Sequence, residues 1–96
     1  MPVAALLHIR HEPAAHRFVA RTAGVEAVLE YHAVDTKTLD YHHTFVPPAL
    51  RGAGMASQLT EHALRYARDN GFKVLPTCPF VARYIERHPE FQSLIG

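Results

Sequence analysis

A turn of small residues between a strand-like run and a helix-like run constrains this chain most strongly. The turn consists of Arg51, Gly52, Ala53, Gly54, Met55 and Ala56. The run before it ends at Val46, and the run after it reaches Asp69. Glycine lets the backbone approach a ligand closely, and a helix start leaves N–H groups without partners. Since the helix dipole also favours negative charge there, the turn predicts a phosphate site.

Length and charge limit the remaining possibilities. The chain has 96 residues, which predicts a single domain over residues 1–96 with one hydrophobic core. Lys and Arg total 10 against 9 for Asp and Glu, a net charge of +1. This balance gives no electrostatic reason to expect nucleic acid or an acidic membrane as a partner.

The cysteine content indicates a compartment. Cys78 is the single cysteine, so it forms no internal disulfide, which is typical of a reducing environment. The apolar run over residues 3–7 is too short for a secretory leader or a membrane span. We therefore expect a cytoplasmic protein.

The first half of the chain predicts antiparallel strands. Residues 16–22 and 26–34 are rich in β-forming residues and are separated by Ala23-Gly24, which predicts a hairpin. A third strand is predicted over residues 39–46, and Pro47-Pro48 ends it because proline donates no N–H. Residues 1–15 have little periodicity and are expected to form an extra strand or a loose arm.

Strict alternation assigns the third strand's side chains to two faces. The two sets are Leu39, Tyr41, His43 and Phe45 on one face, and Asp40, His42, Thr44 and Val46 on the other. The sheet is expected to splay after Val46, where the prolines stop the pairing.

The second half predicts two helices around one strand. Apolar residues recur at helical spacing over residues 53–69, and Asn70-Gly71 is a stop signal. A strand is predicted over residues 72–78, followed by a helix over residues 79–88. The resulting order β-β-β-α-β-α predicts an α/β (α+β) fold with a mainly antiparallel sheet and two flanking helices.

Two familiar phosphate-binding folds do not fit the turn. Ala56-Ser57 stands where a P-loop needs lysine followed by a hydroxyl residue. The spacing of Gly52, Gly54 and Ser57 allows a Rossmann turn, but three preceding antiparallel strands and the short remaining chain leave no room for its parallel sheet.

The turn does match another pattern, Gln/Arg-x-x-Gly-x-Gly/Ala, through Arg51, Gly54 and Ala56. This is the coenzyme A signature of the GNAT superfamily of acetyltransferases, which the chain resembles. Four segments in order, 43–47, 51–56, 76–81 and 84–89, are similar to the small single-domain GNAT-like proteins.

The resemblance implies acetyl coenzyme A as cosubstrate and transfer of its acetyl group to an amine. Its pantetheine arm would lie along residues 39–46 and pair with the backbone near Thr44, Phe45 and Val46. Residues 51–56 would hold the pyrophosphate, with Arg51 adding charge. An extended arm can add to a sheet edge as a further strand does.

The chain lacks the N-terminal helical region that usually shapes the acceptor pocket of this family. The acceptor amine is therefore open: it is a protein or small-molecule amine, at a site within a monomer or completed in a homodimer. The alternative function is a coenzyme A-binding or acyl-sensing module without efficient turnover.

Cys78 and His43 are the candidate catalytic residues. Cys78 precedes the proline that begins the last helix, and a helix start favours a thiolate. The resemblance implies an active-site role, either as a covalent acetyl-cysteine or in positioning the thioester, while a small buried core residue is the alternative. His43 or His42 is a candidate base, and at most one of them can face the substrate.

Other polar residues have simpler interpretations. Tyr84 is a candidate acid, although its apolar neighbours favour core packing. No histidine pair is placed with a third ligand, so no metal site is predicted. Arg83, Glu86 and Arg87 are interpreted as a solvated helix face.

Overall fold

A computed structural model describes residues 8–22, 24–52 and 54–95. The fold is built on one sheet, whose five strands lie side by side in the order in which they occur along the chain. The strands are β1 (Ile9–Glu12), β2 (Arg17–Thr22), β3 (Val25–Asp35), β4 (Thr38–Phe45) and β5 (Lys73–Leu75). The helices are α1 (Met55–Asp69) and α2 (Pro79–Arg87), with short 3-10 turns η1 (Pro13–Ala15), η2 (Pro48–Leu50) and η3 (Pro89–Leu94).

The strand pairing confirms a mixed, mainly antiparallel sheet. Neighbours from β1 to β4 are antiparallel, whereas β5 is parallel to β4 and is reached through the crossover helix α1. A parallel neighbour needs such a crossover because the chain must return to the same end of the sheet. The described residues before β2 include strand β1, so the extra-strand interpretation holds for Ile9–Glu12, and residues 1–7 lie outside the described residues.

Two predicted boundaries were wrong by two residues or more, and the others agree to within one residue. Strand β5 covers only Lys73–Leu75 instead of residues 72–78, because Pro76 follows it and cannot donate to a ladder. Helix α1 begins at Met55 instead of residue 53, because Gly54 adopts a left-handed conformation and cannot belong to the helix.

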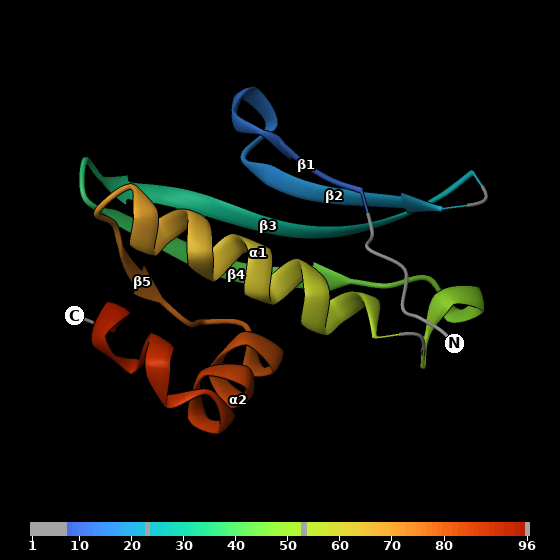
Figure 1. Cartoon of the computed structure of the whole chain (residues 1–96). Helices are drawn as coiled ribbons and strands as arrows, with labels where there is room; N and C mark the ends of the chain where they lie inside the picture. The colour runs from blue at the N-terminus through green and yellow to red at the C-terminus, as the bar shows by residue number, and fades with distance from the viewer. Residues whose placement is uncertain (1–7, 23, 53, 96) are drawn as a thin grey trace.

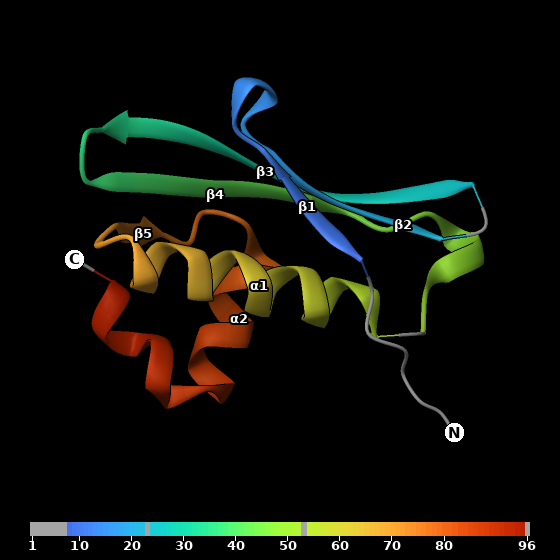
Figure 2. The same cartoon turned by 45° about the horizontal axis from the view of Figure 1, so that its top comes forward.

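All the described helices lie on the same side of the sheet, with α1 along one face and α2 and η3 next to α1 near β5 (Figures 1 and 2). The apolar residues of β2, β3 and β4 that face α1 are buried and form one core with both helices. Tyr41 of β4 is hydrogen-bonded to both helical segments. Its buried hydroxyl donates to the carbonyl of Ala63 in α1 at 2.6 Å. Its own carbonyl accepts the N–H of Cys78, at the start of α2, at 2.9 Å.

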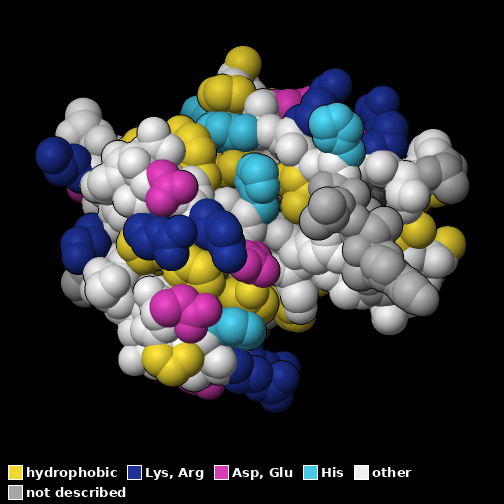
Figure 3. Space-filling model, in the orientation of Figure 1, with side chains coloured by type: hydrophobic (Ala, Val, Ile, Leu, Met, Phe, Trp, Pro, Cys, Tyr) yellow, Lys and Arg dark blue, Asp and Glu magenta, His cyan; other side chains and the backbone are white. Residues whose placement is uncertain are grey.

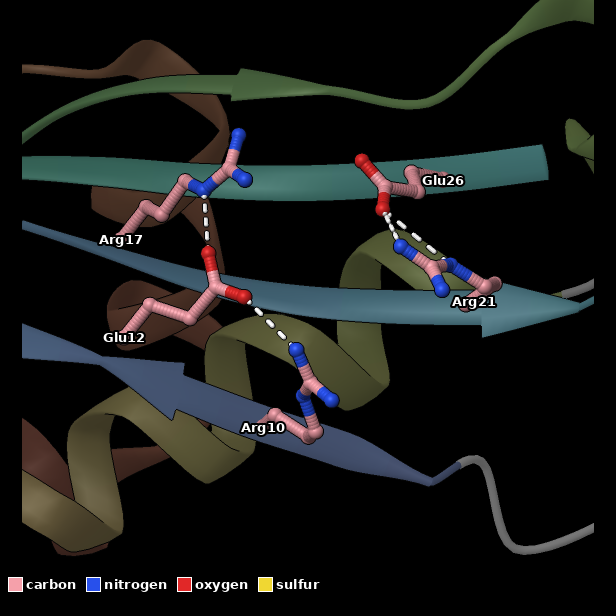
Figure 4. Close-up of polar contacts among 5 residues, drawn as sticks. All are labelled: Arg10, Glu12, Arg17, Arg21 and Glu26. Atoms are coloured by element: carbon pink, nitrogen blue, oxygen red, sulfur yellow. Dashed lines mark hydrogen bonds and ion pairs between the residues drawn. The ribbon is translucent and has the colours of Figure 1, made fainter. Parts of the chain in front are cut away.

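The opposite face of the sheet carries charged side chains on β1, β2 and β3. Figure 4 shows the Glu12 carboxylate between Arg10 and Arg17, and Glu26 paired with Arg21. The Arg10–Glu12 and Arg21–Glu26 pairs each include a well-exposed arginine, so they contribute little stability individually, whereas the Arg17–Glu12 pair is partly buried. No described helix is both long and apolar enough to cross a bilayer.

An irregularity in β4 changes which side chains face the helices. Tyr41 pairs with Tyr31, but the next pair is His43 with Glu30, so His42 is an extra residue in β4. Such a β-bulge bends the strand and reverses the alternation beyond it. Thr44 therefore pairs with the buried Leu29 and lies on the same face as Tyr41.

The predicted alternation along this strand was consequently wrong after Tyr41. His43 and Phe45 lie on the open face of the sheet, opposite Glu30 and Val28. Thr44 lies on the helix face, although strict alternation had placed it opposite to Tyr41. A single inserted residue is enough to exchange the two sets because the side-chain period of a strand is two.

The sheet opens earlier than predicted. Strands β4 and β5 pair through Thr38–Asp40 and Lys73–Leu75, and one residue further along β4 the Tyr41 carbonyl accepts the N–H of Cys78 at the start of α2. Beyond Tyr41, β4 continues to Phe45 beside β3 without a β5 partner. The separation therefore begins at the bulge, and not after Val46.

Candidate functional site

The N-terminus of α1 is an exposed set of helix amides with no internal cap. Gly52 and Gly54 have φ values of 88° and 78°, a left-handed conformation that glycine adopts without strain. No side chain of the described residues caps the helix, and its first turn contains no acidic residue. Since the first N–H groups of any helix lack partners within it, these amides are available to an anion.

A cavity of about 220 Å³ lies at this helix start. Its lining residues are Val46, Leu50, Arg51, Gly52, Gly54, Met55, Ala56, Ser57 and Phe80. Six of the predicted cofactor-binding residues are among them, whereas Ala53 lies outside the described residues. We call this cavity the helix-start pocket.

The sequence interpretation missed three lining residues: Leu50, Ser57 and Phe80. Leu50 and Ser57 flank the signature, so their proximity to the turn was the available signal. Phe80 comes from α2, about 25 residues further along the chain, and only the packing of α2 against α1 brings it here.

Arg51 is held at the mouth of the helix-start pocket. Its Nε donates to the carbonyl oxygen of Val46 at 2.9 Å. That bond uses one of the five guanidinium N–H donors, and the terminal nitrogens carry the other four. A positive charge beside the helix start reinforces its preference for an anion.

The end of β4 connects this pocket to Cys78. Val46 lines the helix-start pocket, and the thiol of Cys78 lies 3.6 Å from the hydroxyl oxygen of Thr44. Phe45 lies between them in sequence, but its side chain is on the open face and 44 % exposed. Phe45 can therefore meet a ligand on the helix side only through its backbone.

Cys78 is fixed by main-chain bonds at the beginning of α2. Its N–H donates to Tyr41, and its carbonyl accepts the N–H of Ala82 at 3.0 Å. The side chain is only 7 % exposed, and Thr44 is its hydrogen-bond partner among the described residues. The bulge thus brings together Thr44 and Cys78, which lie 34 residues apart in sequence.

The structure does not bring His43 to this group of residues. His43 lies on the open face with Glu30, so the sheet separates its ring from the helix side where Cys78 lies. His42 stacks on His32 with ring centroids 4.0 Å apart, also away from Cys78. The bulge placed both histidines on the same face, an arrangement that strict alternation does not allow.

Tyr84 packs in the core, as its apolar neighbours indicated. It is 9 % exposed and stacks on His88 with ring centroids 3.8 Å apart. Burial, followed by the nearby Glu61 and Glu90 carboxylates, raises the pKa of Tyr84 to about 12. This phenol therefore stays protonated at neutral pH.

Within the described ranges, no group of three or more His, Cys, Asp or Glu side chains is arranged to hold a metal ion. The chemistry available at the site is that of helix amides, a guanidinium, a hydroxyl and a thiol.

Comparison with known proteins supports one family. Residues 17–94 match the family described as GCN5-related N-acetyl-transferase. Protein NATD1 of Xenopus tropicalis is 33 % identical over 90 residues, which are 92 % of this chain and 83 % of that protein. Protein NATD1 of Homo sapiens is 32 % identical over 90 residues, covering 92 % of this chain and 80 % of that protein.

A solved structure has the same fold. The NMR solution structure of a GCN5-like protein from Staphylococcus aureus superposes with a TM-score of 0.68 at 21 % identity. The superposition covers 94 % of this chain and 88 % of that one. The family match spans most of the sheet and both helices, so it confirms the predicted transferase class and fold. The chain belongs to the GCN5-related N-acetyltransferase family.

Proposed function

We propose that this chain uses acetyl coenzyme A to acetylate an amine. The main support for this proposal is the uncapped start of α1, which follows two glycines with positive φ. It offers several backbone N–H groups and the Arg51 guanidinium to one anion, which suits a pyrophosphate. The family match supports the same ligand.

The open edge of β4 suits the pantetheine arm. From the bulge to Phe45, this strand has lost its β5 neighbour, so backbone groups on that side can pair with the amides of an extended ligand. An arm that starts at the helix-start pocket and follows Val46 and Thr44 reaches Cys78. The acetyl end would then lie beside the thiol.

Cys78 is the proposed reactive side chain, in one of two roles. As a nucleophile, its sulfur would attack the acetyl carbonyl, the bond to the coenzyme A sulfur would break, and the thiol proton would pass to that sulfur. The amine would then attack the acetyl-cysteine and restore the thiol. Alternatively, the amine attacks the thioester directly, and Cys78 and Thr44 position its carbonyl.

One observation favours the alternative function, a coenzyme A-binding module without efficient turnover. Cys78 contacts a hydroxyl, and His43, the proposed base, faces the other side of the sheet. Acetyl transfer to an ammonium group needs a base to remove a proton. In the enzyme, the incoming acceptor or a second subunit would supply that base.

Intact-mass measurement after incubation with acetyl coenzyme A tests both functions. A covalent role predicts a mass increase of one acetyl group that is absent in Cys78→Ala. A positioning role predicts no adduct but slower acetylation of a panel of amines and peptides by Cys78→Ala. Unchanged acetylation by Cys78→Ala would remove this residue from catalysis. Binding without acetylation of any acceptor would favour the binding module.

Two further properties follow as proposals. The lone cysteine supports a cytoplasmic location, which cell fractionation would test. The acceptor site would be complete within a monomer or built by a homodimer. Sedimentation with and without acetyl coenzyme A distinguishes these two states.

A further inference from the structure

A second cavity continues from the helix-start pocket along the surface between α1 and α2. Its volume is about 200 Å³. Its lining residues are Ser57, Phe80, Arg83, Tyr84, Arg87 and His88. Ser57 and Phe80 also line the helix-start pocket, so one ligand can occupy both cavities. We call the second cavity the arginine groove.

The two arginines of this groove differ from the others in the chain. Five of the eight arginines form ion pairs with carboxylates, and Arg51 donates to the Val46 carbonyl. Figure 3 shows this mixture of Lys/Arg and Asp/Glu side chains over α1. Arg83 and Arg87 make no ion pair or hydrogen bond with any residue that the structure describes.

The geometry of α2 concentrates these charges. Arg83 and Arg87 are four residues apart, so both project from one side of the helix, where like charges repel each other. Glu86 is on the same helix but is not among the lining residues, and none of the described residues that line the groove is a carboxylate. His88 is fixed at its end by a 2.8 Å contact between its Nδ1 and the Tyr84 carbonyl. An anion between the guanidinium groups would remove the repulsion.

We propose that Arg83 and Arg87 bind the 3′-phosphate of coenzyme A and so distinguish it from dephospho-coenzyme A. The inference rests on the proposed function, because it takes the pyrophosphate to occupy the helix-start pocket. The pantetheine arm of that ligand leads along β4 to Cys78. The nucleotide end, on the other side of the pyrophosphate, would lie in the adjoining arginine groove. That end carries a phosphomonoester of charge about −1.5 to −2, which arginine binds through paired N–H donors.

Calorimetric titration with coenzyme A and with dephospho-coenzyme A tests the proposal. We expect the chain to bind coenzyme A at least about tenfold more tightly, as charge-assisted hydrogen bonds to a phosphate allow. Arg83→Gln and Arg87→Gln should weaken coenzyme A binding and leave dephospho-coenzyme A binding nearly unchanged. Arg10→Gln removes the same charge from the open face of the sheet and should leave both affinities unchanged.

The outcomes separate this proposal from the proposed function. Equal affinity for the two ligands would overturn the role of Arg83 and Arg87 while leaving the helix-start pocket supported. Equal weakening of both ligands by the two glutamine variants would also overturn it, since the loss would then not depend on the 3′-phosphate. No binding of either ligand by the folded wild-type chain would contradict the proposed function itself.

Discussion

Gly54 is the residue on which the anion site depends most directly. Its φ of 78° ends the turn and sets the first amides of α1 at the mouth of the helix-start pocket. Apart from the neighbouring residues of the chain, an added Cβ at this position would meet no described residue within 4 Å. Alanine there would therefore be strained by its backbone conformation and would crowd only a ligand, not the protein.

Gly71 provides a matched control at the other end of α1. Its φ is 76°, and an added Cβ there also meets nothing within 4 Å. We predict that Gly54→Ala and Gly71→Ala each lower the free energy of unfolding by about 1 kcal/mol. Only Gly54→Ala should weaken coenzyme A binding, which urea unfolding and calorimetry measure separately. Equal affinity in the two variants would show that the turn does not contact the ligand.

Single residues also show how far sequence reasoning reached. Arg51, Gly54 and Ala56 were identified because their signature is contiguous, and all three line the predicted pocket. The meeting of Thr44 with Cys78 was not foreseen, because it depends on a bulge and on a parallel strand pairing far along the chain. His43 was expected near the acetyl group because it is close to the predicted acetyl position in sequence. The bulge places it on the opposite face of the sheet.

At the scale of elements, the bulge in β4 sets the shape of the site. It occurs where β4 and β5 lose contact, and a bulge bends its strand and increases its twist. Deleting His42 restores a regular pairing without moving Thr44 to the other face. We predict a folded protein whose affinity for coenzyme A falls about tenfold or more, because β4 no longer bends away from β5.

Circular dichroism and calorimetry on the deletion variant check this prediction. His42→Ala keeps the extra residue while removing the stacked imidazole, so it serves as the control and should bind normally. A deletion variant that is folded and binds with wild-type affinity would show that the bulge does not create the opening.

Strand β1 is attached to the core by a histidine. The half-buried His11 stacks on Phe18 at 4.3 Å, and its Nε2 lies 2.6 Å from the Tyr31 hydroxyl oxygen. Tyr66 of α1 meets its ring edge-on at 4.4 Å. Burial, followed by the charge of the partly exposed His62, lowers the pKa of His11 below its usual value of 6.5.

This lowered pKa predicts a loss of stability in acid. The folded chain binds the His11 proton less readily than the unfolded chain, so the unfolded state is favoured as the pH falls below about 6.5. Above that pH, the contribution is constant. We expect His11→Gln to reduce the decrease in unfolding free energy between pH 7.5 and pH 5.5, measured with urea. An identical decrease in the variant would contradict the assignment.

The elements themselves were predictable because their signals are local. Turn residues and apolar spacing located the β2–β3 hairpin, β4, α1 and α2 close to their observed positions. Strand β5 was shorter than predicted because Pro76, which follows Leu75, donates no N–H and ends the pairing with β4. The first strand was left open between two alternatives because its charged residues face solvent and break the apolar pattern.

At the scale of the whole molecule, two adjoining cavities lie next to the opening of the sheet. The helix-start pocket lies between the end of β4 and the start of α1, and the arginine groove continues it along α2. A ligand that binds only this folded arrangement must stabilise it, by about 2.7 kcal/mol at a hundredfold excess over its Kd. We expect the open face of the sheet, which carries the ion pairs of β1 to β3, to take no part in this binding.

An amide chemical-shift titration with coenzyme A tests the central claim most directly, because it reports on each backbone N–H separately. We predict that the largest changes occur at Gly54, Met55, Ala56 and Ser57, with further changes from Thr44 to Val46. The strands β1 and β2 should change little. Saturable binding with its largest shifts on those two strands, or no shift at the start of α1, would contradict the claim that this helix end holds the pyrophosphate.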